Sequence, residues 1–443
     1  MPKMKGAQAL VRQLRSEGVD TVFTLPGVQI MAAFDALYEV QNDIRLFHTR
    51  HEQATTYMAD GYAKVTGKVG VAMVVPGPGA LNAAAGLGTA FASSSPVLLV
   101  SGQIASTSLG RREGQLHEIE DQLDVFKPIT KWNHRVTRVE EIPEAVHEAF
   151  RHLKTGRPRP VELEIPPDTL AREGEADIIE PEEYPKARGS ASDIQRAAQI
   201  LASAKKPTII AGGGALIAGA GRELQELAEF LQAPVMTTQQ SKGVIPEDSP
   251  YVVGVNYAGL GPAYKVVPEC DAILAVGTRF LIRGLQIPDS VKVIHIDADP
   301  TEFGKNFRTE IGIEADAKEG LAQLLQQLRS TGSPKEPRLE EIEGYRQRFD
   351  EEMRALAPQQ HGIIDTIRAE MPDDAIHIGG MTTMGYWSNL SYQVRHPRTF
   401  VTSSYFGTLG YEYPTALGAK IAQPDKTVIA TIGDGGFMYN VQE

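Results

Sequence analysis

The sequence predicts an α/β protein made of three doubly wound parallel-sheet domains, the third of them incomplete. Short runs of β-branched and apolar residues alternate with helix-length segments along the whole chain, which is typical of parallel strands covered by helices. The 443 residues also suffice for two or three separate hydrophobic cores. We expect domains at 1–170, 191–330 and 346–443, joined by linkers at 171–190 and 331–345.

The first domain opens with apolar residues at helical spacing, which Gly18 interrupts. Apolar runs follow as strands, and a segment rich in glycine and alanine between two of them predicts a closely packed helix. A last apolar run closes the domain. The expected helices are 4–17 and 77–92, and the expected strands are 20–25, 69–75, 96–101 and 161–165.

Acidic residues, prolines and few large apolar side chains mark 171–190 as a linker, and charge and proline mark 331–345. The second domain has a helix at 221–231 and strands at 207–211, 234–237, 270–276 and 291–297. The third has strands at 375–378, 400–403 and 427–432. Because this is roughly half a doubly wound domain, we expect the natural protein to continue past Glu443.

Composition excludes several classes of function. The net charge of -12, from 44 basic and 56 acidic residues, opposes nonspecific binding to nucleic acid or to an anionic membrane. A single cysteine, Cys270, excludes an internal disulfide and a cysteine-based zinc site. Because the start of the chain is amphipathic and no long apolar stretch follows, we expect a cytoplasmic protein.

The end of the chain combines a strand with a turn that suits an anion and a metal ion. The apolar run 428–432 leads into Gly433-Asp434-Gly435-Gly436. The carboxylate could bind a hard cation, and the glycines let backbone N–H groups approach a phosphate. Alone the motif is weak evidence, because glycine and aspartate are ordinary turn residues.

A second segment lies far upstream, where Arg50-His51-Glu52-Gln53 opens a helical pattern. One interpretation is structural, since an acidic side chain is favourable at the positive end of a helix. The other is functional, because an apolar run at 70–75 and the turn Gly77-Pro78-Gly79 follow.

Together these segments resemble the thiamine diphosphate-dependent enzymes of the acetolactate synthase and benzoylformate decarboxylase group. Four separated motifs agree in order with that family, and the resemblance runs the whole length of the chain. The three domains would be the family's pyrimidine-binding, central and diphosphate-binding domains. A further match at 157–161 has Arg159 where the family usually has glycine. The four motifs are Arg50-His51-Glu52-Gln53, Gly77-Pro78-Gly79-Ala80, Gly407-Thr408-Leu409-Gly410 with Pro414, and Gly433-Asp434-Gly435-Gly436-Phe437.

The resemblance implies that Glu52 hydrogen-bonds the aminopyrimidine N1′ of the cofactor. A carboxyl that shares a proton with this ring favours the imino tautomer, whose N4′ then removes the C2 proton and gives the ylid. The cofactor acts as the electron sink. The Gly407 carbonyl would accept from the 4′-amino group. Leu409 would bend the cofactor, although a leucine buried in a helix–strand connection is the alternative.

The resemblance also implies how the diphosphate is held. Asp434 would bind Mg²⁺, with backbone N–H groups of Gly435 and Gly436 on the phosphate oxygens and Gly433 as a further cofactor-binding residue. The family's second metal ligand, an asparagine, would fall beyond Glu443. Two further residues, Thr382 and Thr383, align near the diphosphate contacts, although surface threonine is the alternative.

By alignment, residues 114–122 lie over the reacting carbon, and we take His117 and Glu118 as candidate catalytic residues. His117 is either a proton donor or a structural loop histidine. Acetolactate synthases have Phe-Gln-Glu where this chain has Leu116-His117-Glu118, which leaves the acceptor substrate open. Another loop is expected to face the cofactor through Pro26, Gly27 and Val28.

We therefore expect a carboligase that decarboxylates a 2-oxo acid and passes the acyl carbanion to a second carbonyl. The alternatives are a decarboxylase that releases an aldehyde and a non-catalytic relative that binds the cofactor. Family members form dimers or tetramers in which two subunits share each site, so we expect a homo-oligomer. Some bind FAD in the central domain, where this chain has Gly212-Gly213-Gly214, a turn that is not a dinucleotide fingerprint.

Overall fold

The computed structural model describes residues 2–443, and the chain divides into two compact units. Unit 1 contains the chain up to Tyr184 together with Ser403–Asp425 and Ile432–Glu443. Unit 2 contains Pro185–Thr402 and Lys426–Thr431. Each unit is described by itself below.

Unit 1 is built on a six-stranded parallel sheet in the order β3-β2-β4-β5-β7-β6. The central strands are buried on both faces, so they are nearly continuous apolar runs. The strands are β2 (Thr21–Thr24), β3 (Arg45–His48), β4 (Gly70–Val74), β5 (Val97–Gly102), β6 (Trp132–Arg135) and β7 (Val161–Ile165).

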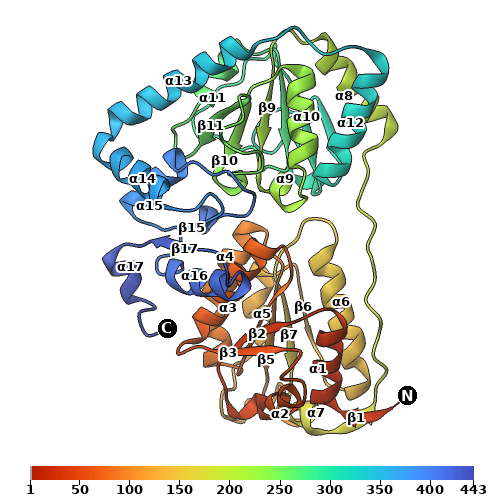
Figure 1. Cartoon of the computed structure of the whole chain (residues 1–443). Helices are drawn as coiled ribbons and strands as arrows, with labels where there is room; N and C mark the ends of the chain where they lie inside the picture. Colours follow the sequence, from red (N-terminus) through yellow and green to blue (C-terminus); the bar gives the residue numbers. More distant parts are fainter. Residues whose placement is uncertain (1) are drawn as a thin grey trace. The chain divides into compact units, whose positions relative to one another are not determined.

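Helices cover both faces of this sheet (Figure 1). One face carries α1 (Gly6–Ser16), α2 (Met31–Glu39) and α6 (Ile142–Lys154), which share a core with the strands. The other face carries α3 (Glu52–Thr66) and α4 (Pro78–Ser93). The shorter helices are η1 (Val28–Ile30), η2 (Ser106–Ser108), α5 (Gln122–Phe126), η3 (Lys127–Ile129), η4 (Val139–Glu141) and α7 (Pro167–Ala171).

The C-terminal segments of unit 1 pack on α3. Helix α16 (Glu412–Ala422) lies against α3, and glycines make the close approach possible. A Cβ at Gly61 would stand 2.3 Å from the Thr415 carbonyl oxygen, and one at Gly418 would stand 2.1 Å from that of Met58. The remaining elements here are η8 (Ser404–Phe406) and α17 (Asp434–Met438).

Unit 2 contains a second six-stranded parallel sheet in the order β11-β10-β9-β12-β13-β14. Its strands are β9 (Pro207–Ala211), β10 (Val235–Thr238), β11 (Val252–Asn256), β12 (Ala272–Val276), β13 (Lys292–Asp297) and β14 (Ile311–Glu314). Its helices are α8 (Ala191–Ser203), α9 (Gly213–Ile217), α10 (Gly221–Leu231), η5 (Gln239–Ser241), α11 (Ala263–Val266), η6 (Val267–Glu269), η7 (Pro300–Glu302) and α12 (Ala317–Thr331).

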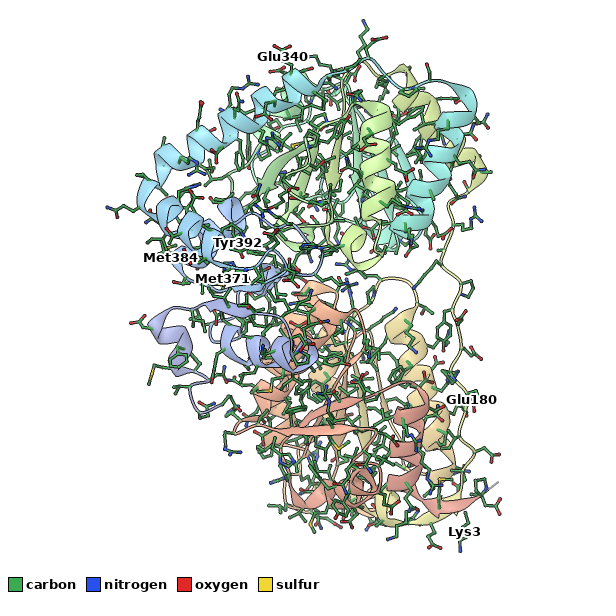
Figure 2. All side chains as sticks on the ribbon, in the orientation of Figure 1. Lys3, Glu180, Glu340, Met371, Met384 and Tyr392 are labelled. Carbon is green, nitrogen blue, oxygen red and sulfur yellow. The ribbon has the colours of Figure 1, made fainter. Side chains whose placement is uncertain are left out.

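A third parallel sheet, of three strands in the order β16-β15-β17, also belongs to unit 2. Its neighbours include a small apolar cluster to which Met384 and Tyr392 contribute (Figure 2). The elements are α13 (Leu339–Leu356), α14 (Pro358–Glu370), β15 (Ile376–Gly379), α15 (Thr383–Ser391), β16 (Phe400–Thr402) and β17 (Val428–Thr431).

The predicted α/β class with parallel sheets is confirmed. The structure adds edge strands, such as β3 and β11, that the sequence analysis did not identify. Helix α13 begins inside the segment 331–345 expected to be a linker, because Ile342 and Tyr345 are buried in the core of unit 2. Part of the segment 171–190 forms β8 (Glu173–Glu175), which pairs with β1 (Lys3–Lys5) in an antiparallel ladder.

Within residues 2–443, no helix combines the length and the apolar character that crossing a membrane requires. The one cysteine, Cys270, is a free thiol that lies partly buried just before β12.

Candidate active site

The first sheet has a topological switch point between β2 and β4. From β2 the chain moves to β3 on one side, and then crosses to β4 and β5 on the other side. The loops that follow β2 and β4 therefore diverge, and ligands of open α/β sheets bind at such a point beyond the carboxyl ends of the strands. The expected site residues between Pro26 and Glu118 follow β2, β3, β4 and β5.

Glu52 is the first residue of α3 and is half-buried. The His51 imidazole caps this helix by accepting from the Gln53 N–H at 3.3 Å. The backbone N–H groups of Arg50 and His51 donate to the Glu443 carboxylate at 2.8 and 2.9 Å. The C-terminal residue Glu443 therefore fixes the start of α3, and with it the position of Glu52.

Two features of α4 surround the Glu52 carboxylate. The Asn82 side-chain amide donates to Glu52 Oε2 at 3.0 Å. At Gly79, a Cβ would lie 3.4 Å from Glu52 Oε1 and 2.6 Å from Val75 Cγ2. The first turn of α4 therefore approaches the carboxylate so closely that a side chain at position 79 would displace Val75 or Glu52.

The same turn touches the loop that carries His117. Gly77 has a φ of +57°, and a Cβ there would lie 2.4 Å from the His117 carbonyl oxygen. The Gly77 N–H donates to Oε1 of Gln122 at 2.9 Å. The segment Gly77–Gly79 thus contacts both the Glu52 carboxylate and the His117 backbone.

The loop at 114–118 is held from two sides. Gln29 donates to the Leu116 carbonyl at 3.3 Å, and the Glu118 carboxylate accepts from the Gln115 N–H at 2.8 Å. Among residues 2–443, Nδ1 of the half-buried His117 has no hydrogen-bond partner. Leu116 is 65% exposed, so this loop presents an apolar side chain to solvent. The Glu118 carboxylate, in contrast, bonds within the loop, to Gln115.

The loop after β2 closes against the end of β4. A Cβ at Gly27 would lie 2.2 Å from Val75 Cγ1, so only glycine fits there. Pro26 and Val28 on either side are exposed, Val28 by 67%. The structure therefore gathers Pro26, Gly27, Glu52, Gly79 and the His117 loop around the switch point.

The segment 404–410 packs on α4. Thr408 and Thr89 share a hydrogen bond of 2.9 Å between their hydroxyls, and a Cβ at Gly88 would lie 2.4 Å from the Phe406 ring. Gly407 has a φ of +65°. Leu409 is 49% exposed, so it does not lie in the core and its side chain is open to a ligand.

The Asp434 loop is open as well. Asp434 begins α17, and both it and Gly435 are exposed. A Cβ at Gly435 would meet no atom of the described chain within 4 Å, whereas Gly433 is half-buried and Gly436 is buried. Within residues 2–443 no group of three or more His, Cys, Asp or Glu side chains is arranged to hold a metal. A single carboxylate completed by phosphate oxygens is a common way to hold Mg²⁺, so the donor set fits that ion with a diphosphate.

The two candidate threonines belong to unit 2. Thr382 directly precedes α15, is half-buried and makes no side-chain capping hydrogen bond, and Thr383 is exposed.

The triple glycine of unit 2 has a packing explanation. The switch point of the second sheet lies between β9 and β12. There a Cβ at Gly212 would lie 2.4 Å from the Gly277 carbonyl oxygen, and one at Gly214 would lie 2.7 Å from Gly277 Cα. Neighbouring backbone, rather than approach to a ligand, requires the glycines at these two positions.

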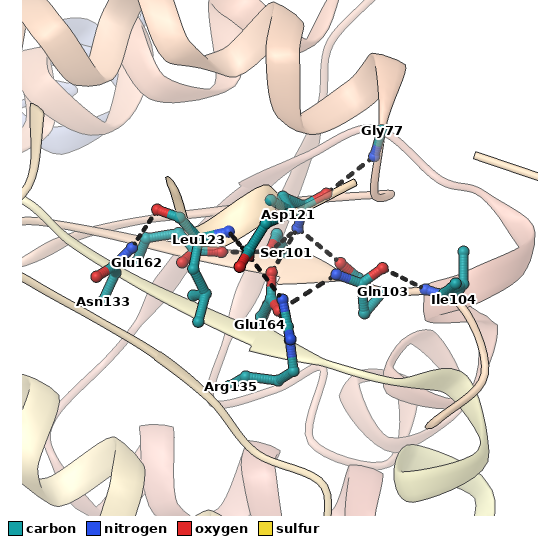
Figure 3. Close-up of polar contacts among 12 residues, drawn as sticks. Gly77, Ser101, Gln103, Ile104, Asp121, Leu123, Asn133, Arg135, Glu162 and Glu164 are labelled. Atoms are coloured by element: carbon teal, nitrogen blue, oxygen red, sulfur yellow. Dashed lines mark hydrogen bonds and ion pairs between the residues drawn. The ribbon is translucent and has the colours of Figure 1, made fainter. Parts of the chain in front are cut away.

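A buried polar network lies behind the Gly77 turn (Figure 3). It includes two acids on the inner strand β7, Glu162 and Glu164, which sequence reasoning missed. The Ser101 hydroxyl donates to Glu162 at 2.6 Å, and Arg135 pairs with Glu164. Burial and the nearby Glu164 charge raise the pKa of Glu162 well above its usual value. Burial also raises the pKa of Glu164, although Arg135 opposes that shift.

Sequence reasoning also missed Asn82, Gln122 and Glu443. An available signal was the pair of acids in the apolar run 161–165, since charge in a strand buried on both faces requires a partner. No comparable local signal marks Gln122.

Family models match all three parts of the chain. They are described as the N-terminal TPP binding domain of thiamine pyrophosphate enzymes at residues 4–125, their central domain at 194–324 and their C-terminal TPP binding domain at 367–443. A probable acetolactate synthase large subunit of Methanocaldococcus jannaschii is 39% identical over 99% of this chain and 77% of its own length. The chain belongs to the thiamine pyrophosphate enzyme family.

Other relatives in the family carry two kinds of name. The acetolactate synthase isozyme 3 large subunit of Escherichia coli is 34% identical over 100% of this chain and 80% of its own length. A probable 2-ketoarginine decarboxylase of Pseudomonas aeruginosa is 36% identical over 99% of this chain and 79% of its own length. The predicted family and the predicted thiamine diphosphate dependence are thereby confirmed, and the chain is an acetolactate synthase-like enzyme of this family.

Proposed function

We propose that this chain decarboxylates a 2-oxo acid and transfers the remaining acyl unit to a second carbonyl compound. The observation that carries the proposal is the position of Glu52, whose carboxylate lies between Asn82 and the Gly79 turn at the switch point of the first sheet. When bound, thiamine diphosphate supplies the carbon nucleophile and the electron sink that such a reaction needs.

Different residues of unit 1 have different roles in the proposed reaction. Glu52 would hold a proton at the N1′ atom of the pyrimidine, and Asn82 orients its carboxylate. Leu409, which is open on the surface, would support the cofactor, and the Gly407 carbonyl would accept from its amino group. His117 and Glu118 lie on the loop that covers the reacting carbon, and Pro26, Gly27 and Val28 line the same site.

The charged end of the cofactor is held by other residues. Asp434 would bind Mg²⁺, the backbone N–H groups of Gly435 and Gly436 would donate to phosphate oxygens, and Gly433 would be a further cofactor contact. Open space at Gly435 supports this assignment, since no atom of residues 2–443 lies within 4 Å of a Cβ placed there. In unit 2, taken by itself, Thr382 and Thr383 remain candidates for hydroxyl contacts with a diphosphate.

The second candidate reaction is decarboxylation with release of an aldehyde. The relative named a probable 2-ketoarginine decarboxylase favours it, as does the exposed Leu116 beside His117 in place of the Phe-Gln pair of acetolactate synthases. One experiment separates the two reactions. The protein is titrated with thiamine diphosphate and Mg²⁺ in a calorimeter, and is then given pyruvate and a 2-oxo acid with a cationic side chain.

We expect binding heat, carbon dioxide release and acetolactate from pyruvate. Aldehyde with no ligation product would move the assignment to the decarboxylase. No binding heat would contradict both reactions, and binding without turnover on either acid would indicate a cofactor-binding relative.

The proposed functional unit is a homodimer, or a tetramer of two dimers, in which Glu52 and Asp434 of different subunits serve one cofactor. Mixing the variants Glu52→Gln and Asp434→Asn, at a Mg²⁺ concentration too low for Asp434→Asn alone to be active, tests this arrangement. Shared sites predict that the mixture regains activity, because one site of each mixed dimer is intact. A mixture that exchanges subunits and stays inactive contradicts it.

Packing already explains Gly212 and Gly214, so these glycines give no support to FAD binding in unit 2. A colourless purified protein would dismiss it.

A further inference from the structure

Gln122 connects the buried acids of β7 with the turn beside Glu52. It is the first residue of α5 and is fully buried. The preceding residue, Asp121, caps this helix by accepting from the Leu123 N–H at 3.1 Å. The backbone at Gln122 is therefore anchored independently of its side chain.

The chemistry of its neighbours fixes which way the Gln122 amide points. Nε2 directs its two hydrogens at three acceptors, the Gly102 carbonyl at 3.1 Å, Glu164 Oε2 at 3.1 Å and Ser101 Oγ at 3.0 Å. Oε1 accepts from the Gly77 N–H at 2.9 Å. A carbonyl only accepts and a backbone N–H only donates, so the reversed amide would oppose like groups at both ends.

The Gly77 N–H belongs to the turn that shapes the surroundings of Glu52. Gly77 has positive φ and no room for a side chain, because His117 lies against it. From this turn α4 begins, and its first two turns carry Gly79 and Asn82, the two neighbours of the Glu52 carboxylate. A shift of the turn would therefore move both neighbours together.

We propose that Gln122 is a positioning residue for Glu52, acting through the Gly77 N–H and the start of α4. This inference rests on the proposed function only for its effect on turnover. Its structural part concerns the Gly77 turn and holds for the protein without cofactor.

The test compares Gln122→Met with the matched control Gln103→Met. Gln103 is also buried and donates to the same acid, Glu164, at 3.2 Å, but its Oε1 accepts from the Ile104 N–H at 2.7 Å instead of from Gly77. Both substitutions remove an amide of the same size from the same network. Only the first removes the partner of the turn.

The first measurement is amide hydrogen exchange of the cofactor-free proteins. We expect the peptide that spans residues 76–82 to exchange about tenfold faster or more in Gln122→Met than in Gln103→Met, since its anchor is lost. Equal exchange in the two variants overturns the proposal, whatever the enzyme catalyses. If Gln122→Met does not fold, Gln122→Asn replaces it, because its amide is one carbon shorter and should leave the Gly77 N–H without its partner, so the same faster exchange is expected.

The second measurement separates kcat from cofactor affinity. We expect Gln122→Met to lower kcat about 10- to 100-fold, as small misplacements of catalytic groups do, while the dissociation constant of thiamine diphosphate changes little. Near-ultraviolet circular dichroism of the bound cofactor should show less of the imino tautomer. Equal kcat in Gln122→Met and Gln103→Met would overturn the catalytic part. An inactive wild type would count against the proposed function and leave the exchange result to decide the structural part.

Discussion

Asn82 donates its side-chain amide to Glu52 Oε2 at 3.0 Å, and this bond ties helix α4 to the first residue of α3. The two helices follow different strands of the first sheet, so the bond joins both sides of its switch point. It places a neutral donor beside the carboxylate that the proposed chemistry requires.

Asn82→Asp is expected to change the pH dependence of catalysis. Two carboxyl groups at hydrogen-bond distance share a proton and release it at higher pH than one group alone. The acidic limb of the pH–rate profile should therefore move up by about 1–2 pH units. The control Asn306→Asp makes the same replacement on an exposed loop of unit 2 and should leave the profile in place. An unmoved profile in Asn82→Asp would refute the proposed role of the contact.

Gly79→Ala is expected to abolish most activity while the fold survives. The new Cβ would lie 2.6 Å from Val75 Cγ2 and 3.4 Å from Glu52 Oε1. Overpacking of this kind costs about 1–3 kcal/mol of the free energy of unfolding. Gly362→Ala in the exposed middle of α14 meets nothing among the described atoms and should stabilise the protein by about 0.5–1 kcal/mol. Kinetics and denaturant unfolding of both variants measure this, and a fully active Gly79→Ala would show that Glu52 tolerates displacement.

Asp434→Asn is expected to weaken Mg²⁺ binding in the presence of thiamine diphosphate by about tenfold or more, or about 1.4 kcal/mol. The amide removes the formal charge that a hard cation prefers. Asp425→Asn, on the exposed loop before β17, is the matched control. Titration of Mg²⁺ followed by calorimetry gives both affinities, and equal values would remove Asp434 from the metal site.

Glu162→Gln is expected to stabilise the protein only at higher pH. Because burial raises the pKa of Glu162 in the folded state, stability present at low pH is lost as pH rises above the value of an unfolded glutamate, near 4.3. The loss is about 1.4 kcal/mol for each pH unit until the folded group ionises. The variant should therefore match the wild type at pH 4 and exceed it at pH 8, as measured by denaturant unfolding. The exposed Glu180→Gln should show no such trend, and a pH-independent gain in Glu162→Gln would contradict the interpretation.

The sequence predicted the strands that are buried on both faces. Strands β4, β5 and β9 appear in the chain as mostly apolar runs, and their expected bounds agree with the structure to within a residue. The edge strands β3 and β6 carry polar residues such as Arg45 and Asn133, because one side faces solvent. Pairing with an inner strand, rather than local composition, makes them strands.

Part of the candidate site could be predicted from the sequence for a similar reason. Glu52 and the Gly77–Gly79 turn lie in short motifs whose spacing is fixed by a strand and the helix that follows it. The role of Gln122 depends on Gly77, which lies 45 residues away in the chain. Nothing in the polar sequence before Gln122 indicates that contact. Glu443, which caps the start of α3, is likewise determined only by the tertiary fold.

Cys270 is the one thiol of the chain, and its Sγ donates to the Val267 carbonyl. Burial raises its pKa to about 12, so almost no thiolate exists at neutral pH. Maleimide probes should therefore leave the wild type unlabelled. They should label a variant with a cysteine at an exposed position, such as Thr383→Cys. Fluorescent reporters could then follow ligand arrival on this protein without first replacing its native sulfur.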